Sequence, residues 1–231
     1  MKIIAAGDFH FPFENKKALA VFEKHLGQKK WDYFILGGDL IDFPYLSKYS
    51  KNNLRSIEGK RITKDYDYAN EHLDRWDSIL KGTKTQKVFI IGNHDQRVEK
   101  YIDANPNLEG FLELESNLTL NRRGYKTIYN YPRGEVFSVE GINFLHGFYH
   151  NQFHAKKHLD SFEGSAVYFH THAFQSFTKS RFNKNLRIGQ AVGCMCDYEQ
   201  DYMGKRPSAW QLGFLEIETG DKSTQFTSVM I

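Results

Sequence analysis

The first half of the chain alternates short apolar runs with stretches in which apolar residues recur at helical spacing. Uninterrupted apolar runs of this length predict buried strands, and they cover residues 2–6, 33–36 and 88–91. Helical spacing follows each run, over residues 16–27, 65–81 and 98–102. This repeated strand–helix order is typical of a mainly parallel sheet with covering helices.

The predicted helices have recognisable ends. Asn15 precedes the first helix, and an asparagine at this position can accept a backbone N–H bond and cap the helix. Gly27 follows the last apolar residue of the same helix and predicts its C-terminal stop. Pro106 lacks the backbone N–H that a helix needs, so the third helix is expected to end before it.

The second half of the chain has a different pattern, in which strand signals follow one another through turns. Residues 136–139 and 142–145 flank Glu140-Gly141, which predicts a two-residue hairpin. Residues 212–217 and 226–231 predict a closing hairpin, and further short runs cover 166–169 and 188–192. We therefore expect antiparallel pairing in this half. Together the halves predict an α/β fold of two packed sheets flanked by helices, in one domain spanning residues 1–231.

Five of the apolar runs end in polar side chains that can bind a metal. In chain order these are Asp8 and His10, Asp39 and Asp42, Asn93, His94 and Asp95, then His146, and finally His170 and His172. Any single run could simply end in a turn. Because α/β sheets place their ligand sites at the carboxyl ends of the strands, five such endings favour one shared site.

The chemistry of this set narrows the candidate ligands. Carboxylates, imidazoles and an amide oxygen, without a thiolate, suit manganese, iron, zinc or nickel. The donors are too many for a single catalytic ion, which needs an open position for water. We therefore expect two ions that share a bridging carboxylate.

The ordered motifs D-x-H, G-D-x-x-D, G-N-H-D, H-G and H-x-H, over residues 8–172, resemble those of the calcineurin-like metallophosphoesterases. The resemblance implies a four-layer α/β/β/α sandwich and two divalent ions. Manganese is the first candidate for these ions, with iron, zinc or nickel as alternatives. One ion would be held by Asp8, His10, Asp39 and His172. The other would share Asp39 and be held by Asn93, His146 and His170.

The sequence differs from the family pattern at one position, and one further segment is similar to some members of the family. Phe169 stands where the family usually has a glycine before H-x-H, which affects the shape of that turn. Residues 206–214 are also similar to the C-terminal strand of small single-domain members found in bacteriophages.

The resemblance also implies catalytic roles for the rest of G-N-H-D. In a two-metal site a bridging hydroxide attacks phosphorus in line. His94 would protonate the leaving oxygen or stabilise its charge, with Asp95 orienting the ring. Arg97 is a candidate phosphate ligand, although an ordinary arginine at a helix start is an equal alternative.

A basic, helical insert over about residues 44–85 bears on the substrate. Its first part, residues 44–64, holds six basic residues against Glu58 and carries more positive charge than the net +3 of the whole chain. We predict that Lys48, Lys51 and Arg55 help bind a polyanion such as a nucleic acid. A second basic cluster follows the last motif, at Lys179, Arg181, Lys184 and Arg187. A solvated surface is the alternative for both.

Other features give weaker predictions. His150, His154 and His158 follow His146 at helical spacing. We interpret them as a partly exposed stripe on one helical face, with a third metal site as the alternative. Cys194 and Cys196 cannot build a disulfide framework, and we interpret them as half-buried strand thiols in a reducing compartment, with a redox or metal role for the C-x-C as the alternative. No stretch approaches a membrane span or a signal peptide, so we expect a cytoplasmic protein with no membrane partner.

Three classes of function follow from these observations. The first is a metal-dependent phosphodiesterase, with nucleic acid as a candidate substrate and nuclease activity. The second is a phosphomonoesterase acting on a phosphoprotein or a small metabolite. The third is a catalytically silent metal-binding module, which the complete ligand set and His94 disfavour. The natural substrate, the metals and the oligomeric state are not encoded in these patterns.

Overall fold

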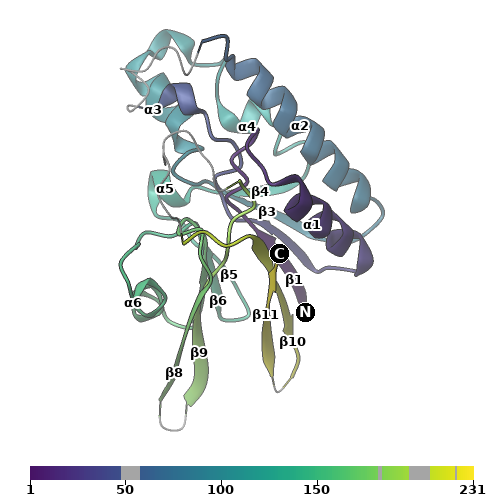
Figure 1. Ribbon diagram of the computed structural model, residues 1–231, viewed down its shortest axis with the longest axis vertical. Helices are drawn as coiled ribbons and strands as arrows, with labels where there is room; N and C mark the ends of the chain where they lie inside the picture. The colour runs from purple at the N-terminus through teal and green to yellow at the C-terminus, as the bar shows by residue number, and fades with distance from the viewer. Residues whose placement is uncertain (48–57, 182–183, 198–208, 222) are drawn as a thin grey trace.

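Two mixed sheets lie face to face, with helices on their outer faces (Figure 1). The computed structural model describes the chain except residues 48–57, 182–183, 198–208 and 222. Among the described residues the first sheet has the strand order β11-β10-β1-β2-β3-β4 and the second β5-β6-β7-β9-β8. The predicted α/β/β/α sandwich is therefore confirmed.

The first sheet is built by the alternating half of the chain. Its parallel strands are β1 (Lys2–Ala6), β2 (Tyr33–Leu36), β3 (Gln86–Ile90) and β4 (Tyr125–Ile128). The helices between and after them are α1 (Lys16–Gln28), α2 (Ile62–Ile79) and α3 (Gln96–Ala104). The predicted closing hairpin, β10 (Gly213–Thr219) with β11 (Thr224–Met230), adds to β1 antiparallel. The sequence pattern had not predicted β4.

The second sheet corrects the expectation of antiparallel pairing. Its strands are β5 (Phe137–Val139), β6 (Ile142–Leu145), β7 (Ser165–Tyr168), β8 (Gln175–Arg181) and β9 (Lys184–Ala191). The hairpins β5–β6 and β8–β9 are antiparallel, but β6, β7 and β9 run parallel. The helix α6 (His154–Ser161) crosses over between β6 and β7, and such a crossover returns the chain in the same direction.

Short helical segments complete the described fold. They are η1 (Pro44–Leu46), η4 (Pro106–Leu108), α4 (Leu114–Asn117) and α5 (Asn130–Arg133). At the start of α1 the side chain of Asn15 accepts a 3.0 Å hydrogen bond from the Ala18 N–H, which confirms the predicted cap. The helix continues through Gly27 to Gln28, so the predicted stop lies slightly early. No helix in the described ranges is both long and apolar enough to span a bilayer.

Strand alternation divides the core into layers. Ile4 and Ala6 of β1 face α1 and α2, where they pack with Phe22 and Trp76. The intervening residues of β1 point into the space between the sheets and pack with residues of the second sheet such as Phe144. A smaller cluster joins the second sheet to α6. The layers bring the carboxyl ends of both sets of parallel strands to one edge of the molecule.

The α6 histidines are packing residues, which corrects the prediction of a partly exposed stripe. His158 is fully buried and its ring stacks on Tyr168, with centroids 3.7 Å apart. Its Nε2 accepts the Phe148 N–H at 3.0 Å, and its Nδ1 donates to the His154 carbonyl at 2.8 Å. The His154 Nδ1 lies 2.5 Å from the Tyr168 hydroxyl. With both rings engaged in this way, neither belongs to a metal-competent group among the described residues.

The buried ring of His158 predicts a loss of stability in acid. Burial lowers the pKa of His158 to about 4 from 6.5, so between these values the unfolded chain binds a proton that the native chain does not. The contribution of the neutral ring to the free energy of unfolding is therefore complete above pH 6.5. About 3 kcal/mol of it is lost as the pH falls from 6.5 to 4. We expect the free energy of unfolding in urea to differ less between pH 7.5 and pH 4.5 for His158→Gln than for the natural chain. The exposed His150→Gln is the control and should keep the full difference; an equal difference in His158→Gln would contradict the assignment.

Candidate metal centre

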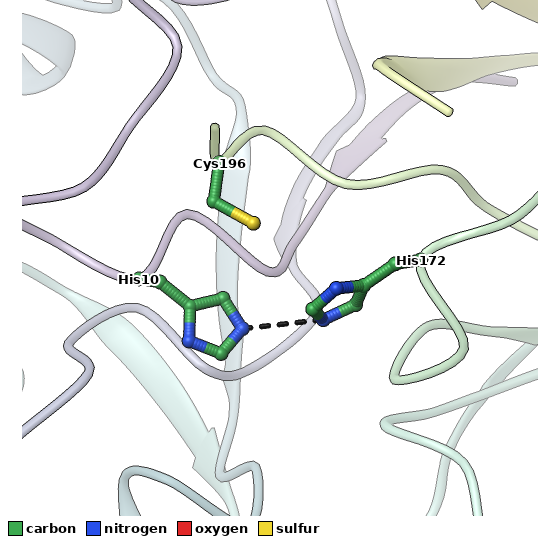
Figure 2. Close-up of side chains that lie close together, drawn as sticks. All are labelled: His10, His172 and Cys196. Atoms are coloured by element: carbon green, nitrogen blue, oxygen red, sulfur yellow. Dashed lines mark hydrogen bonds between the residues drawn. The ribbon is translucent and has the colours of Figure 1, made fainter. Parts of the chain in front are cut away.

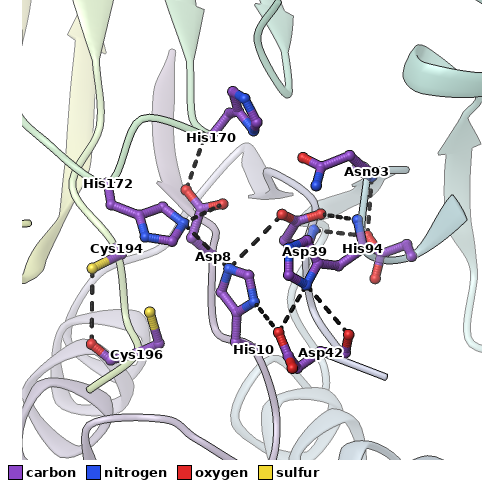
Figure 3. A network of polar contacts seen from close by, with 12 residues as sticks. Asp8, His10, Asp39, Asp42, Asn93, His94, His170, His172, Cys194 and Cys196 are labelled. Carbon is purple, nitrogen blue, oxygen red and sulfur yellow. Dashed lines mark hydrogen bonds and ion pairs between the residues drawn. The ribbon is translucent and has the colours of Figure 1, made fainter. Parts of the chain in front are cut away.

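The candidate ligands meet where the carboxyl ends of the two sheets come together. Asp8 and His10 follow β1, Asp39 follows β2 and Asn93 follows β3. His146 follows β6, and His170 and His172 follow β7. Figure 3 shows that the labelled side chains of this set converge from separate loops. Residues separated by as many as 164 positions, Asp8 and His172, are thus in contact.

The first group of donors surrounds His172. Its Nε2 lies 3.2 Å from the His10 Nε2 and 3.5 Å from Oδ1 of Asp8. The His10 Nε2 is also 3.8 Å from Oδ2 of Asp39. These separations suit donor atoms that share one ion, because ligand bonds to such ions are about 2.0–2.2 Å long.

The second group lies on the other side of Asp39. The Nε2 of His146 is 3.3 Å from the same Oδ2 of Asp39 and 3.0 Å from Oδ1 of Asn93. Asp39, His146 and His170 place one donor atom each within 4.8 Å of the others. Asp39 therefore touches both groups, which is the position a bridging carboxylate needs.

The polar atoms of the site fit a pair of cations. Oδ1 of Asp8 is buried and has no hydrogen-bond partner in the described part of the chain. Nδ1 of His10 is bound to Asp42 at 2.9 Å, and Nδ1 of His146 donates to the Gly37 carbonyl at 2.8 Å. Both rings therefore turn Nε2 toward the centre, as outer hydrogen bonds do for metal-binding histidines.

The charges of the site show the same complementarity. Burial opposes a charged His146 ring, but the carboxylate of Asp39 outweighs it and raises the pKa of His146 to about 9. Burial and the neighbouring His146 lower the pKa of His170 to about 4, so this ring is neutral at pH 7 and offers a lone pair. Burial raises the pKa of Asp39, yet His146 and the other rings bring it well below its usual value.

The backbone of the ligand loops is unusual. Five of the candidate ligands have left-handed backbone conformations, with φ between 50° and 73°: Asp8, His10, Asp39, His170 and His172. Non-glycine residues rarely adopt this region, and each costs about 1–3 kcal/mol. Such strain is concentrated here because each loop must turn sharply to aim its side chain at one point.

Glycines provide the space for these turns. A Cβ on Gly92 would lie 2.2 Å from Oδ1 and 2.5 Å from the backbone N of Asp39. Gly38 has a φ of +95°, and a Cβ there would lie 2.6 Å from Nδ1 of His146. The glycines of G-D-x-x-D and G-N-H-D thus let three ligand loops pack against one another.

Asp42 connects the candidate metal ligands to His94. Its Oδ1 is 2.9 Å from Nδ1 of His10 and 2.7 Å from Nδ1 of His94. Burial opposes its charge, but the hydrogen bonds from these two rings hold the pKa of Asp42 well below its usual value. Arg97 donates to the Asp42 carbonyl at 2.6 Å and to Nε2 of His94 at 3.0 Å. Asp42 therefore contacts and orients both rings.

Asp95 has a different position from the predicted one. Its carboxylate is fully buried and accepts the backbone N–H groups of Asp39 at 2.7 Å and Gly92 at 3.0 Å, with further bonds from Leu40 and Ile41. Burial and the charge of Asp39 raise the pKa of Asp95 to about 7. Asp95 therefore joins two ligand loops through their backbones, and Asp42, not Asp95, contacts the His94 ring among the described residues.

The predicted basic residues fall into two sets, of which the structure describes one. Lys48, Lys51 and Arg55 lie outside the described residues. The second basic cluster belongs to β8 and β9, whose hairpin runs to the opposite end of the sheet (Figure 1). Lys179 is paired there with Asp160 at 2.6 Å. This cluster therefore does not flank the candidate ligands.

Sequence reasoning missed some neighbours of the centre. The Tyr131 ring lies 5.4 Å from that of His146, and the Trp210 ring lies 4.1 Å from that of His172. Tyr131 follows the unpredicted strand β4, so recognition of that strand would have placed it at the same edge. Cys196 lies in one group with His10 and His172, fully buried rather than half-buried. Its signal was available, because the C-x-C follows the apolar run at residues 188–192.

Comparisons with known proteins identify a family. The family model of the calcineurin-like phosphoesterases matches residues 1–187. No curated protein matches the chain. Among solved structures, a single mutant of Vps29 from Entamoeba histolytica is similar at 14% identity, with 100% of this chain and 99% of that chain covered and a TM-score of 0.45. Vacuolar Protein Sorting 29 from Cryptosporidium parvum has 14% identity, 100% and 97% coverage and a TM-score of 0.48. Zinc-complexed Vps29 from Entamoeba histolytica has 13% identity, 100% and 99% coverage and a TM-score of 0.45.

The close approach at Gly92 predicts that a single methyl group disrupts the centre. In Gly92→Ala the new Cβ would have to displace the Asp39 loop, so we expect a marked loss of bound metal and of stability. Gly27→Ala is the matched control, since its Cβ meets only Ile79, at 3.6 Å, and helical alanine gains about 0.5–1 kcal/mol. Metal analysis and urea unfolding of both variants would test this. Normal metal content in Gly92→Ala would show that the loops can separate without harm.

Proposed function

The chain belongs to the calcineurin-like phosphoesterase family, and from this premise we propose that it is a two-metal phosphodiesterase. The observation that carries the proposal is the complete donor set around Asp39, with an oriented histidine beside it. A silent metal-binding module would have no need of that histidine. We propose Asp8, His10, Asp39 and His172 for one ion, and Asp39 with Asn93, His146 and His170 for the other.

Divalent ions suit these donors, with manganese as the first candidate and iron, zinc or nickel as alternatives. When bound, they would supply an activated water and offset the charge of the phosphoryl oxygens. The protein fixes their positions through the outer hydrogen bonds of His10 and His146. Asp95 adds to this by holding the Asp39 loop against the Gly92 turn.

We propose that His94 delivers the proton to the leaving group. Its side chain is partly open, at 11% exposure, whereas that of Asp42 behind it is 1% exposed. With Nδ1 held by Asp42, Nε2 is the atom that can carry the transferred proton. In the free protein Nε2 accepts a hydrogen bond from Arg97. A phosphate oxygen would compete for that guanidinium, so that substrate binding frees Nε2 for its role.

The substrate class is supported less directly, by charge. The basic residues before α2 follow Asp39 and Asp42 closely in sequence, and a polyanionic diester such as nucleic acid suits them. Of these residues, Lys60 and Arg61 are described, and the ammonium of Lys60 lies 5.2 Å from the centroid of the Phe13 ring, just beyond the first motif. Lys48, Lys51 and Arg55 are proposed to act with it. A phosphomonoesterase is the alternative outcome of the test below.

The first test compares substrate classes on the natural chain. We expect metal-dependent hydrolysis of bis(nitrophenyl) phosphate with a kcat/KM at least about tenfold above that for nitrophenyl phosphate. Single- and double-stranded nucleic acids should be assayed in parallel. Preference for the monoester would favour a phosphatase. Stoichiometric metal without turnover of any ester would favour a silent module.

The second test separates metal binding from proton transfer. Asp39→Ala should lose metal and activity together, because both donor groups depend on this carboxylate. His94→Gln should keep its metals but lose about 10²–10⁴ in rate on a substrate with an alkoxide leaving group. The loss should shrink on a nitrophenyl diester, whose leaving group scarcely needs a proton. Metal content and turnover should be measured on the same preparations.

His25→Gln is the control for this series, because His25 is held by Glu216 on the helical side of the first sheet. It should keep metal and rate. Loss of metal in His94→Gln would make His94 a ligand. Full activity of His94→Gln on the alkoxide substrate would assign the proton to another group.

A further inference from the structure

The C-x-C motif reaches the metal centre from a strand that supplies none of the proposed ligands. Cys194 and Cys196 follow β9, whose carboxyl end lies beside that of its parallel neighbour β7. The segment is tied to the first ligand loop, because the Met195 N–H donates to the Asp8 carbonyl at 3.1 Å. Cys196 also forms an isolated bridge with Glu14. Its backbone is thereby fixed against the loop that carries His10.

The side chain of Cys196 points toward two proposed ligands. Figure 2 shows its sulfur directed toward the rings of His10 and His172. One donor atom from each of the three residues lies within 4.8 Å of the other two, and all three side chains are buried. Between the imidazoles the separation is 3.2 Å. Oδ1 of Asp8, a proposed ligand of the same ion, is buried without a hydrogen-bond partner among the described residues, so the polar atoms here are not satisfied by the protein alone.

These separations are close to those within one coordination shell. Bonds from zinc are about 2.3 Å to sulfur and 2.0–2.1 Å to imidazole nitrogen, so neighbouring donors in a tetrahedral shell lie about 3.6 Å apart. A shift of about 1 Å or less would bring the Cys196 sulfur to that separation from the two rings. Cys194 differs: its thiol is directed to the Cys196 carbonyl at 3.8 Å and it belongs to no such group in the described residues.

We propose that Cys196 is an additional ligand of the ion held by Asp8, His10, Asp39 and His172, and that it biases this position toward a thiophilic metal. The inference rests on the proposed metal centre and specifies its selectivity. Coordination converts the Cys196 thiol to a thiolate and releases one proton to solvent. A thiolate favours zinc or iron over manganese, so the two positions would differ in metal preference.

Cobalt provides a direct probe, because thiolate coordination to Co²⁺ gives a charge-transfer band in the near ultraviolet that nitrogen and oxygen ligands do not give. The natural chain, stripped of metal and reloaded with Co²⁺, should show this band. Cys196→Ser and Cys196→Ala should lose it while still binding cobalt. Cys194→Ser, which removes the other buried thiol of the same motif, should keep it. In competition, Cys196→Ser should favour zinc over manganese about tenfold less than the natural chain does.

The natural chain alone can overturn the proposal, whether or not the variants fold. Stoichiometric cobalt without the band would show that Cys196 is not a ligand, and would leave the proposed phosphoesterase centre intact. Failure to bind cobalt at all would overturn the metal centre and this inference with it. A band that is lost in Cys194→Ser but kept in Cys196→Ser would show that Cys194, not Cys196, is the ligand. That result would also overturn the proposal.

Discussion

The contact of the buried Asp39 carboxylate with the surrounding imidazoles is the interaction on which the rest of the centre depends. The carboxylate lies between His10 and His146, at 3.8 and 3.3 Å, and accepts the His94 N–H at 2.7 Å. An isolated carboxylate in such a place would be strongly destabilising, because burial removes its hydration. Here the imidazoles compensate it, and the Asp39 carboxylate raises the pKa of His146, which favours a proton on that ring. Divalent cations would replace such protons, so metal binding and proton release are coupled in this centre.

The same arrangement explains why the ligand loops are strained. Left-handed backbones at five candidate ligands are unfavourable individually, and they persist because the surrounding structure fixes them. Asp95 is part of that structure, since four backbone N–H groups of two ligand loops converge on its carboxylate. Gly38 and Gly92 are the other part, because any side chain there would separate the loops. The polar residues of G-N-H-D therefore divide into a proposed ligand, a proposed acid and a buried brace.

Much of the fold could be predicted because buried parallel strands are short apolar runs, and their ends indicate the sheet edge. The pattern failed where burial is partial. The edge strand β4 buries only Tyr125 and Ile128 of its YKTI sequence, so it lacks an apolar run. The direction of β7 depends on α6, whose buried histidines do not resemble a helical apolar stripe. Asp95 was assigned to His94 from the family resemblance, but adjacent residues at a turn point in different directions. The partner that contacts the ring, Asp42, comes from another loop.

Phe169 shows how the core determines the geometry of the centre. It replaces the glycine that is usual before H-x-H, and its ring lies over two glycines of the first sheet. A Cβ on Gly37 would be 2.2 Å from that ring, and one on Gly7 would be 2.7 Å from it. The absence of side chains at Gly7 and Gly37 thus makes room for the aromatic ring, which packs in the layer between the sheets. His170 follows directly, and its N–H donates to Asp8 at 2.9 Å. The H-x-H turn is therefore anchored to the first sheet both by a buried ring and by a bond to a proposed ligand. Since each sheet supplies part of the donor set, the packing between the sheets fixes the separation of the donors.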